Sequence, residues 1–99
     1  MVKVKNINGT SKDRYSNSKG YSSWLDYWEN NSIFVTLDKC ACIGCSNKAK
    51  VGAHVKKTHE GNKWYIVPLC YKCNMKTESF NVDEAYLVEV NKENTVDLW

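Results

Sequence analysis

The stretch Leu69-Cys70-Tyr71-Lys72-Cys73-Asn74 decides the fold, together with its upstream counterpart Cys40-Ala41-Cys42-Ile43-Gly44-Cys45. Each stretch contains a C-x-x-C unit, whose two intervening residues allow both sulfurs to face one point in space. A structural zinc site requires four ligands in a tetrahedron, with thiolates about 2.3 Å from the ion. The sequence therefore predicts one zinc ion that is bound only by sulfur.

The upstream cysteines do not by themselves show which of them is the fourth zinc ligand. Cys45, Cys70 and Cys73 belong to every arrangement, and the fourth ligand is either Cys40 or Cys42. Cys42 completes the second C-x-x-C unit with Cys45. Cys40 is separated from Cys45 by four residues, and this spacing also forms a zinc knuckle. We slightly favour Cys40, in which case Cys42 is a small buried apolar residue.

Two other interpretations of the cysteines are less favoured. The count of five is odd, which argues against a pure disulfide framework. A redox C-x-x-C motif would accompany a parallel βαβ pattern, which the sequence lacks. The first six residues contain no apolar signal segment, and no stretch is long enough to span a bilayer. A reducing, cytoplasmic compartment without membrane contact is therefore expected, where clustered cysteines usually bind metal.

The composition predicts one domain over residues 1–99. A chain of 99 residues with 42% hydrophobic residues buries a limited core, so a metal is an expected source of extra stability. The net charge of +3 permits contact with nucleic acid without requiring it.

Hydrophobic periodicity and turn residues predict an α+β fold, with its core at about residues 40–80 and residues 1–20 as a partly mobile arm. The N-terminal helix begins at Ser22 or Ser23, carries Trp24, Leu25 and Trp28 on one face, and ends at Asn30-Asn31. We expect those side chains to pack in the core, with base stacking as the alternative. The other expected elements are strands at 2–7, 33–37, 51–57, 63–67 (closed by Pro68) and 85–90, turns at 58–62 and 91–94, a helix at 70–80, and a returning segment at 95–99.

The segment from the first cysteine pair to the second resembles the HNH endonuclease family. Gly52-Ala53-His54-Val55 occupies the first hairpin strand, and Leu69 to Thr77 matches the start of the family's helix closely. The match covers roughly residues 40–78. The resemblance implies a treble-clef, ββα-metal core decorated by a four-cysteine zinc site.

The same resemblance assigns roles to three residues. His54 falls where the family has its general base, and Asn74 where a helix residue binds the catalytic ion. Ala53 falls at the other metal-ligand position, where the family has Asp or His, and alanine cannot bind a metal. A catalytic Mg²⁺ or similar ion needs oxygen or imidazole ligands. His59 and Glu60, in the turn, are the remaining donors nearby. The alternative role of His54 is a structural histidine within the hairpin.

Three functional hypotheses follow. The leading one is a zinc-stabilised HNH-like module that binds DNA or RNA without robust nuclease activity. The second is a metal-dependent endonuclease that uses His54, and the third is a structural or protein-interaction domain that docks through Trp24, Trp28 and Trp64. Several lysines are either a solvated face or contacts to phosphate: Lys48, Lys50, Lys56, Lys57, Lys63, Lys72 and Lys76.

Overall fold

The computed structural model describes residues 1–7, 23–33, 38–59 and 63–90. Among them, no helix is both long and apolar enough to cross a bilayer. The elements in chain order are β1 (Val2–Asn6), α1 (Trp24–Asn31), β2 (Val51–Lys57), β3 (Trp64–Leu69), α2 (Tyr71–Asn74), β4 (Phe80–Val82), the 3₁₀ helix η2 (Glu84–Tyr86) and β5 (Val88–Val90).

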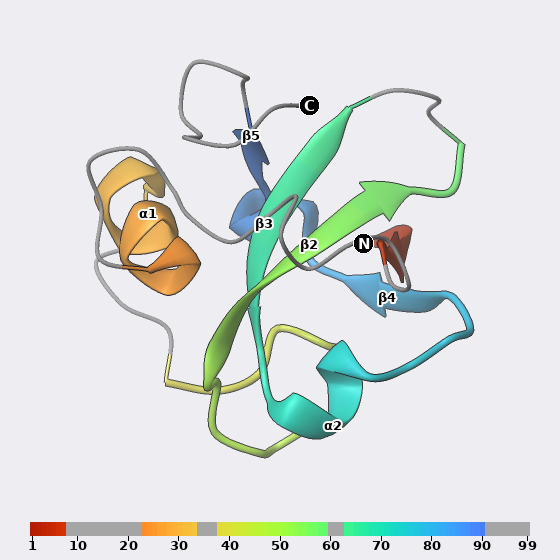
Figure 1. Ribbon diagram of the computed structural model, residues 1–99. Coiled ribbons are helices and arrows are strands. Elements are labelled where there is room, and N and C mark those ends of the chain that lie inside the picture. The colour runs from red at the N-terminus through yellow and green to blue at the C-terminus, as the bar shows by residue number, and fades with distance from the viewer. Residues whose placement is uncertain (8–22, 34–37, 60–62, 91–99) are drawn as a thin grey trace.

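The described strands form one antiparallel sheet in the order β4-β1-β2-β3-β5 (Figure 1). The β2–β3 hairpin lies at its centre, and Ala53 is paired with Val67. β1 pairs with β2 and also with β4, so residues from the start of the chain lie beside residues 80–82. The α+β class predicted from the sequence is therefore present.

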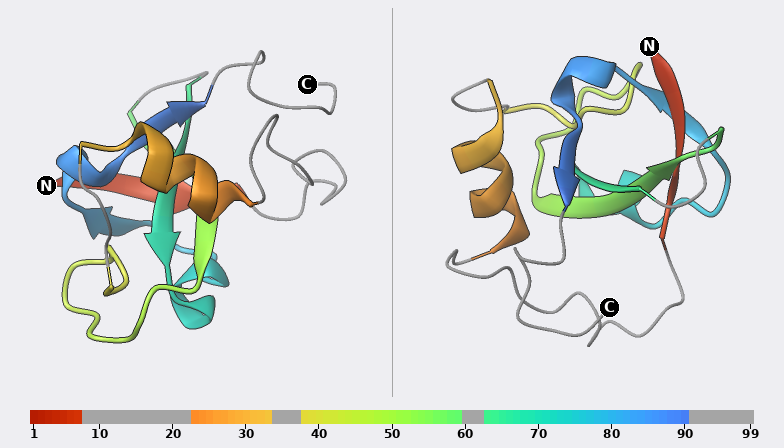
Figure 2. Two further views of the ribbon diagram at one scale, coloured as in Figure 1. Left: turned by 90° about the vertical axis from the view of Figure 1, so that its left-hand side faces the viewer. Right: turned by 90° about the horizontal axis from the view of Figure 1, so that it is seen from above.

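The two faces of the sheet bury different sets of side chains, because successive strand residues point to opposite faces. α1 packs on one face and α2 on the other (Figure 2). The "tryptophan core", on the α1 side, consists of Trp24, Tyr27, Trp28, Ile66 and Val90. The "main core", on the α2 side, consists of Val4, Cys40, Ala41, Cys42, Ala53, Val55, Tyr65, Val67, Leu69, Cys70, Cys73, Phe80 and Val82.

The predicted N-terminal helix is confirmed as α1. The Ser23 hydroxyl accepts a hydrogen bond from the backbone N–H of Asp26 at 3.0 Å, which caps the helix start. The indole N–H of Trp28 donates to the carbonyl of Tyr86 at 2.6 Å. Trp24 and Trp28 are buried, so the expectation of core packing is right for these two residues, and the docking surface built on them is wrong. Leu25 is only partly buried and does not belong to that core. Trp64 is partly buried against the same core.

Gly52 allows α1 to approach the sheet closely. A Cβ atom at this position would lie 2.5 Å from the carbonyl carbon of Trp24 and 2.6 Å from the backbone nitrogen of Leu25. Both are backbone atoms, so α1 itself would have to move away.

We therefore expect Gly52→Ala to lower the free energy of unfolding by about 1–3 kcal/mol, the usual cost of overpacking. Urea denaturation followed by tryptophan fluorescence measures this loss. An unchanged midpoint would show that α1 does not depend on this contact.

Three predicted elements differ from the structure. The second hairpin strand continues through Pro68 to Leu69. Proline is tolerated there because β5 pairs only with residues 64–66, which leaves β3 at an edge at this point. The helix expected over 70–80 is a single turn, because Phe80 and Val82 are buried in a strand against β1. The strand expected over 85–90 is divided into η2 and β5.

Other expectations lie outside the described residues. These are most of the arm at 1–20, most of the strand at 33–37, part of the turn at 58–62, and the segments 91–94 and 95–99.

Candidate metal centre

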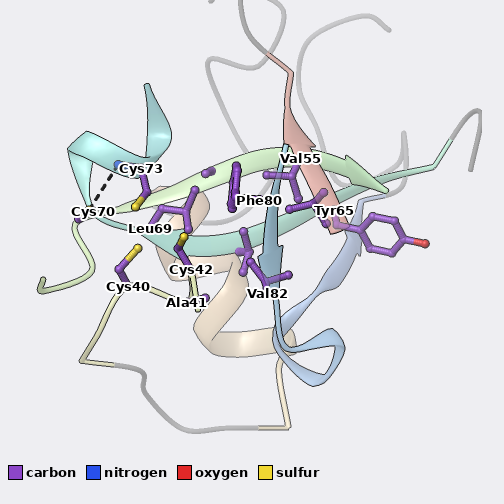
Figure 3. Packing of buried hydrophobic residues seen from close by; sticks show 13 residues of the cluster. Cys40, Ala41, Cys42, Val55, Tyr65, Leu69, Cys70, Cys73, Phe80 and Val82 are labelled. Carbon is purple, nitrogen blue, oxygen red and sulfur yellow. Dashed lines mark hydrogen bonds between the residues drawn. The ribbon is translucent and has the colours of Figure 1, made fainter. Parts of the chain in front are cut away.

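Four cysteines converge at one end of the main core. The sulfurs of Cys40, Cys45, Cys70 and Cys73 all lie within 4.8 Å of one another. Three of these residues are buried and Cys45 is partly buried. Figure 3 shows Cys40, Cys70 and Cys73 at the opposite end of the cluster from Tyr65 and Val55. The sulfur of Cys42 is not part of the group.

The upstream pair comes from a folded-back segment, residues 38–50. Cys40 and Cys45 are brought together by a turn at Gly44, whose φ of 89° favours glycine. The Cys40 N–H donates to the Asn47 carbonyl at 2.8 Å. The Ala41 N–H donates to the Pro68 carbonyl at 2.9 Å, which fixes the segment to the end of β3.

The downstream pair lies at the start of α2. Cys70 is the N-cap residue, and its sulfur accepts a hydrogen bond from the Cys73 N–H at 3.4 Å. This geometry brings both sulfurs to the same side of the turn.

Asn6 ties the turn that carries Cys70 and Cys73 to β1. Its buried side-chain amide donates to the carbonyl of Cys73 at 2.9 Å and to that of Lys76 at 3.1 Å. No local pattern in the sequence marks Asn6, because only the tertiary fold brings it to residues 67 and 70 positions away. Asn47, whose side chain lies 3.7 Å from the Cys70 sulfur, was missed for the same reason.

The spacing of the sulfurs suits a tetrahedral ion. Ligands about 2.3 Å from a zinc ion are separated by about 3.8 Å in a regular tetrahedron, and the sulfurs of Cys45 and Cys70 are 3.8 Å apart. A disulfide would bring them to about 2.05 Å, and all five cysteines are free. The donor set therefore fits a metal ion that prefers thiolates.

The electrostatic environments of the thiols differ. Burial disfavours ionisation of Cys70, but hydrogen bonds from the Cys73 backbone and from Asn47 outweigh it and lower the pKa to about 6. Burial raises the pKa of Cys40 to about 11. Burial and the neighbouring thiols also raise the pKa of Cys73. The thiols of Cys40 and Cys73 thus resist ionisation without a cation, because burial and neighbouring negative charge disfavour a further thiolate.

Cys42 lies beside this group and contacts a lysine. Its sulfur is 3.7 Å from the Lys76 ammonium group, and proximity to Cys42 raises the pKa of that lysine. A zinc ion with four thiolates carries a net charge of about −2. Lys72 and Lys76, which line a hollow of about 330 Å³ beside Cys45 and Cys73, are suited to offset that charge.

The residues assigned by the HNH resemblance are not brought together. Ala53 points into the main core, on the same side of the sheet as α2 and Asn74. His54 points to the opposite face, where its ring lies 4.7 Å from the Trp24 ring in an edge-to-face arrangement. His59 is exposed, and Glu60 lies outside the described residues. In the part of the chain that the structure describes, the four-cysteine group alone joins three or more Cys, His, Asp or Glu side chains.

The environment of His54 predicts a pH-dependent stability. Burial lowers its pKa from 6.5 to about 4. The folded state therefore holds a neutral imidazole over a range in which the unfolded chain is protonated. We expect this contribution to be complete above about pH 6.5 and to be lost as the pH falls toward 4, by at most about 3 kcal/mol.

Urea denaturation from pH 4 to 8, compared with His54→Gln, isolates the effect. Loss of metal and titration of carboxylates affect both proteins, so only the difference between the two curves reports on His54. Parallel curves would contradict the prediction.

The lysines expected to form either a solvated face or contacts to phosphate lie on different parts of the structure. Lys57 forms an ion pair with Glu84 at 2.7 Å, and Lys63 lies 4.0 Å from Glu89. Lys72 and Lys76 flank the metal centre, Lys48 and Lys50 belong to the 38–50 segment, and Lys56 points to the α1 side of the sheet.

Comparisons of the chain with protein-family models, with curated proteins and with solved structures found no match.

Proposed function

We propose that this protein is a zinc-stabilised, HNH-like module that binds nucleic acid and does not cleave it. The observation that carries the proposal is the convergence of four cysteine sulfurs from two distant segments. An all-sulfur tetrahedral site without an open position is typical of structural zinc.

Two features support a module of HNH-like type. The β2–β3 hairpin leads directly into a helical turn that carries Cys70 and Cys73, and the other two cysteines precede the hairpin. The order of these parts agrees with the treble-clef arrangement that the resemblance implies. The one-turn length of α2 is a departure from it.

Two features favour binding without cleavage. Metal-dependent phosphodiester hydrolysis needs an ion that polarises the phosphate, together with a base near it. Ala53 offers no ligand and is buried with 2% exposure. His54 packs against Trp24 on the face of the sheet opposite α2, which separates the candidate base from Asn74.

The positive charge of the chain and its surface lysines support the binding of nucleic acid. The chain has a net charge of +3. Lysines on a folded surface contact phosphates without regard to sequence and give binding that weakens with salt. DNA and RNA share this phosphate chemistry.

Three measurements on the full chain test the proposal. Elemental analysis of protein purified without added metal should give one zinc per chain. Fluorescence anisotropy with labelled DNA and RNA should show binding that weakens as salt rises. A supercoiled plasmid should remain intact with Mg²⁺ or Mn²⁺. Cleavage that is lost in His54→Ala would favour the endonuclease, whereas a folded protein without zinc would contradict the proposal.

A protein-docking function is the second candidate, and exposed apolar side chains favour it. Ile43, Tyr71 and Met75, all in or beside the metal-binding segments, are 51%, 62% and 75% exposed. The double variant Tyr71→Ser/Met75→Ser would abolish such docking. Under the first proposal it leaves the salt-dependent binding of nucleic acid in place.

A further inference from the structure

One face of the sheet carries three lysines close together. β1 and β2 are paired so that Lys5 lies directly opposite Lys56. Lys3, two residues before Lys5, is on the same face and lies opposite Asn81 of β4. All three lysines are exposed. We call Lys3, Lys5 and Lys56 the lysine face.

The arrangement is unfavourable for the isolated protein. Directly opposed residues of an antiparallel pair have Cβ atoms about 4.5–5.5 Å apart, and like charges there are destabilising. Among the described residues, no carboxylate forms an ion pair with Lys3, Lys5 or Lys56. Lys57, by contrast, points to the main-core face and is paired with Glu84.

The remainder of this side of the sheet is covered. α1 packs over β2 and β3, and the Trp24 ring lies against His54, two residues before Lys56. The lysine face therefore lies beside α1 and extends over β1.

We infer that the lysine face binds the sugar–phosphate backbone of a nucleic acid, an inference that rests on the proposed function and locates its contact surface. Phosphates between Lys5 and Lys56 replace mutual repulsion with attraction, and the Asn81 amide supplies a neutral donor beside Lys3. Lysine ammonium groups are suited to phosphates because each acts as a point charge with three donors.

Two other surfaces are less suited to phosphate. Lys72 and Lys76 are beside the thiolates, whose negative charge they offset and which would repel a phosphate. The apolar side chains of Ile43, Tyr71 and Met75 would suit a protein partner, because protein interfaces depend on buried apolar anchors. The lysine face has positive charge without either feature.

The test compares charge variants of the zinc-loaded full chain. The ligands are a short fluorescein-labelled DNA duplex and the corresponding single strand. In Lys5→Gln/Lys56→Gln, the slope of log Kobs against log salt should become shallower by about two on the duplex, because about 0.9 counterion is released per phosphate contact. The matched control is Lys39→Gln/Lys48→Gln, which removes a second directly opposed lysine pair within the described residues and should leave the slope unchanged.

A second variant separates binding from folding. Lys56→Glu places opposite charges across β1 and β2, so its melting temperature should equal or exceed that of the parent while its affinity for the labelled DNA falls at least tenfold. If the parent binds DNA and the lysine-face variants bind equally well, this inference is overturned and the proposed function stands. If the parent binds neither DNA form nor the matching RNA strand, both are overturned.

Discussion

Replacement of Cys73 by serine is expected to abolish metal binding and to unfold the domain, whereas replacement of Cys42 leaves both intact. Cys73 belongs to the group of four sulfurs within 4.8 Å of one another, and Cys42 does not. Structural zinc contributes about 10–16 kcal/mol in small zinc-finger peptides. A domain of ordinary stability has only about 5–15 kcal/mol in total, so loss of one ligand removes most or all of it.

The measurement is zinc content together with thermal unfolding followed by circular dichroism. Cys42→Ser is the matched control, since it makes the same chemical change at a buried cysteine two residues from Cys40. Cys40→Ser should behave like Cys73→Ser. A Cys42→Ser protein that loses zinc, or a Cys73→Ser protein that keeps both zinc and fold, would contradict the assignment. A chelator should unfold the parent in the same way, because the hollow at Cys45 and Cys73 gives it access.

Replacement of Ala53 by aspartate is expected to destabilise the fold by about 3–5 kcal/mol, the cost of leaving a buried charge without a partner. Ala53 is 2% exposed in the main core and is paired with Val67 on the neighbouring strand. The side chains that surround it in the main core are apolar or cysteine, so a carboxylate there would be buried away from solvent.

Urea denaturation at pH 7 measures the loss. Ala53→Asn is the control, because its side chain has nearly the same shape without the charge, so the difference between the two variants reports on the charge. The same experiment bears on the nuclease hypothesis. An Ala53→Asp protein that stays as stable as the parent and gains metal-dependent cleavage would show that this position lies in a degenerate catalytic site, contrary to its burial here.

The sequence by itself determined the parts of the protein that depend on local patterns. The alternation of apolar residues in 51–57 and the short apolar run within 63–67 identified the β2–β3 hairpin, because both patterns are properties of neighbouring residues. Ser23 and the spacing of Trp24 and Trp28 identified α1 for the same reason. The C-x-x-C units indicated a metal site, because two sulfurs at that spacing can reach one ion without help from the rest of the chain.

The tertiary structure decided what depended on residues far apart in sequence. Either Cys40 or Cys42 could join Cys45 locally, and the docking of Ala41 onto the Pro68 carbonyl brings the Cys40 sulfur to the group. Burial of Phe80 against β1 ends the helix early, since pairing with a distant strand outweighs helix propensity. The packing of α1 also decides the surroundings of His54. Because α1 approaches the sheet closely at Gly52, Trp24 covers the face of the sheet on which His54 lies. Such choices arise from packing between segments, which no local pattern encodes.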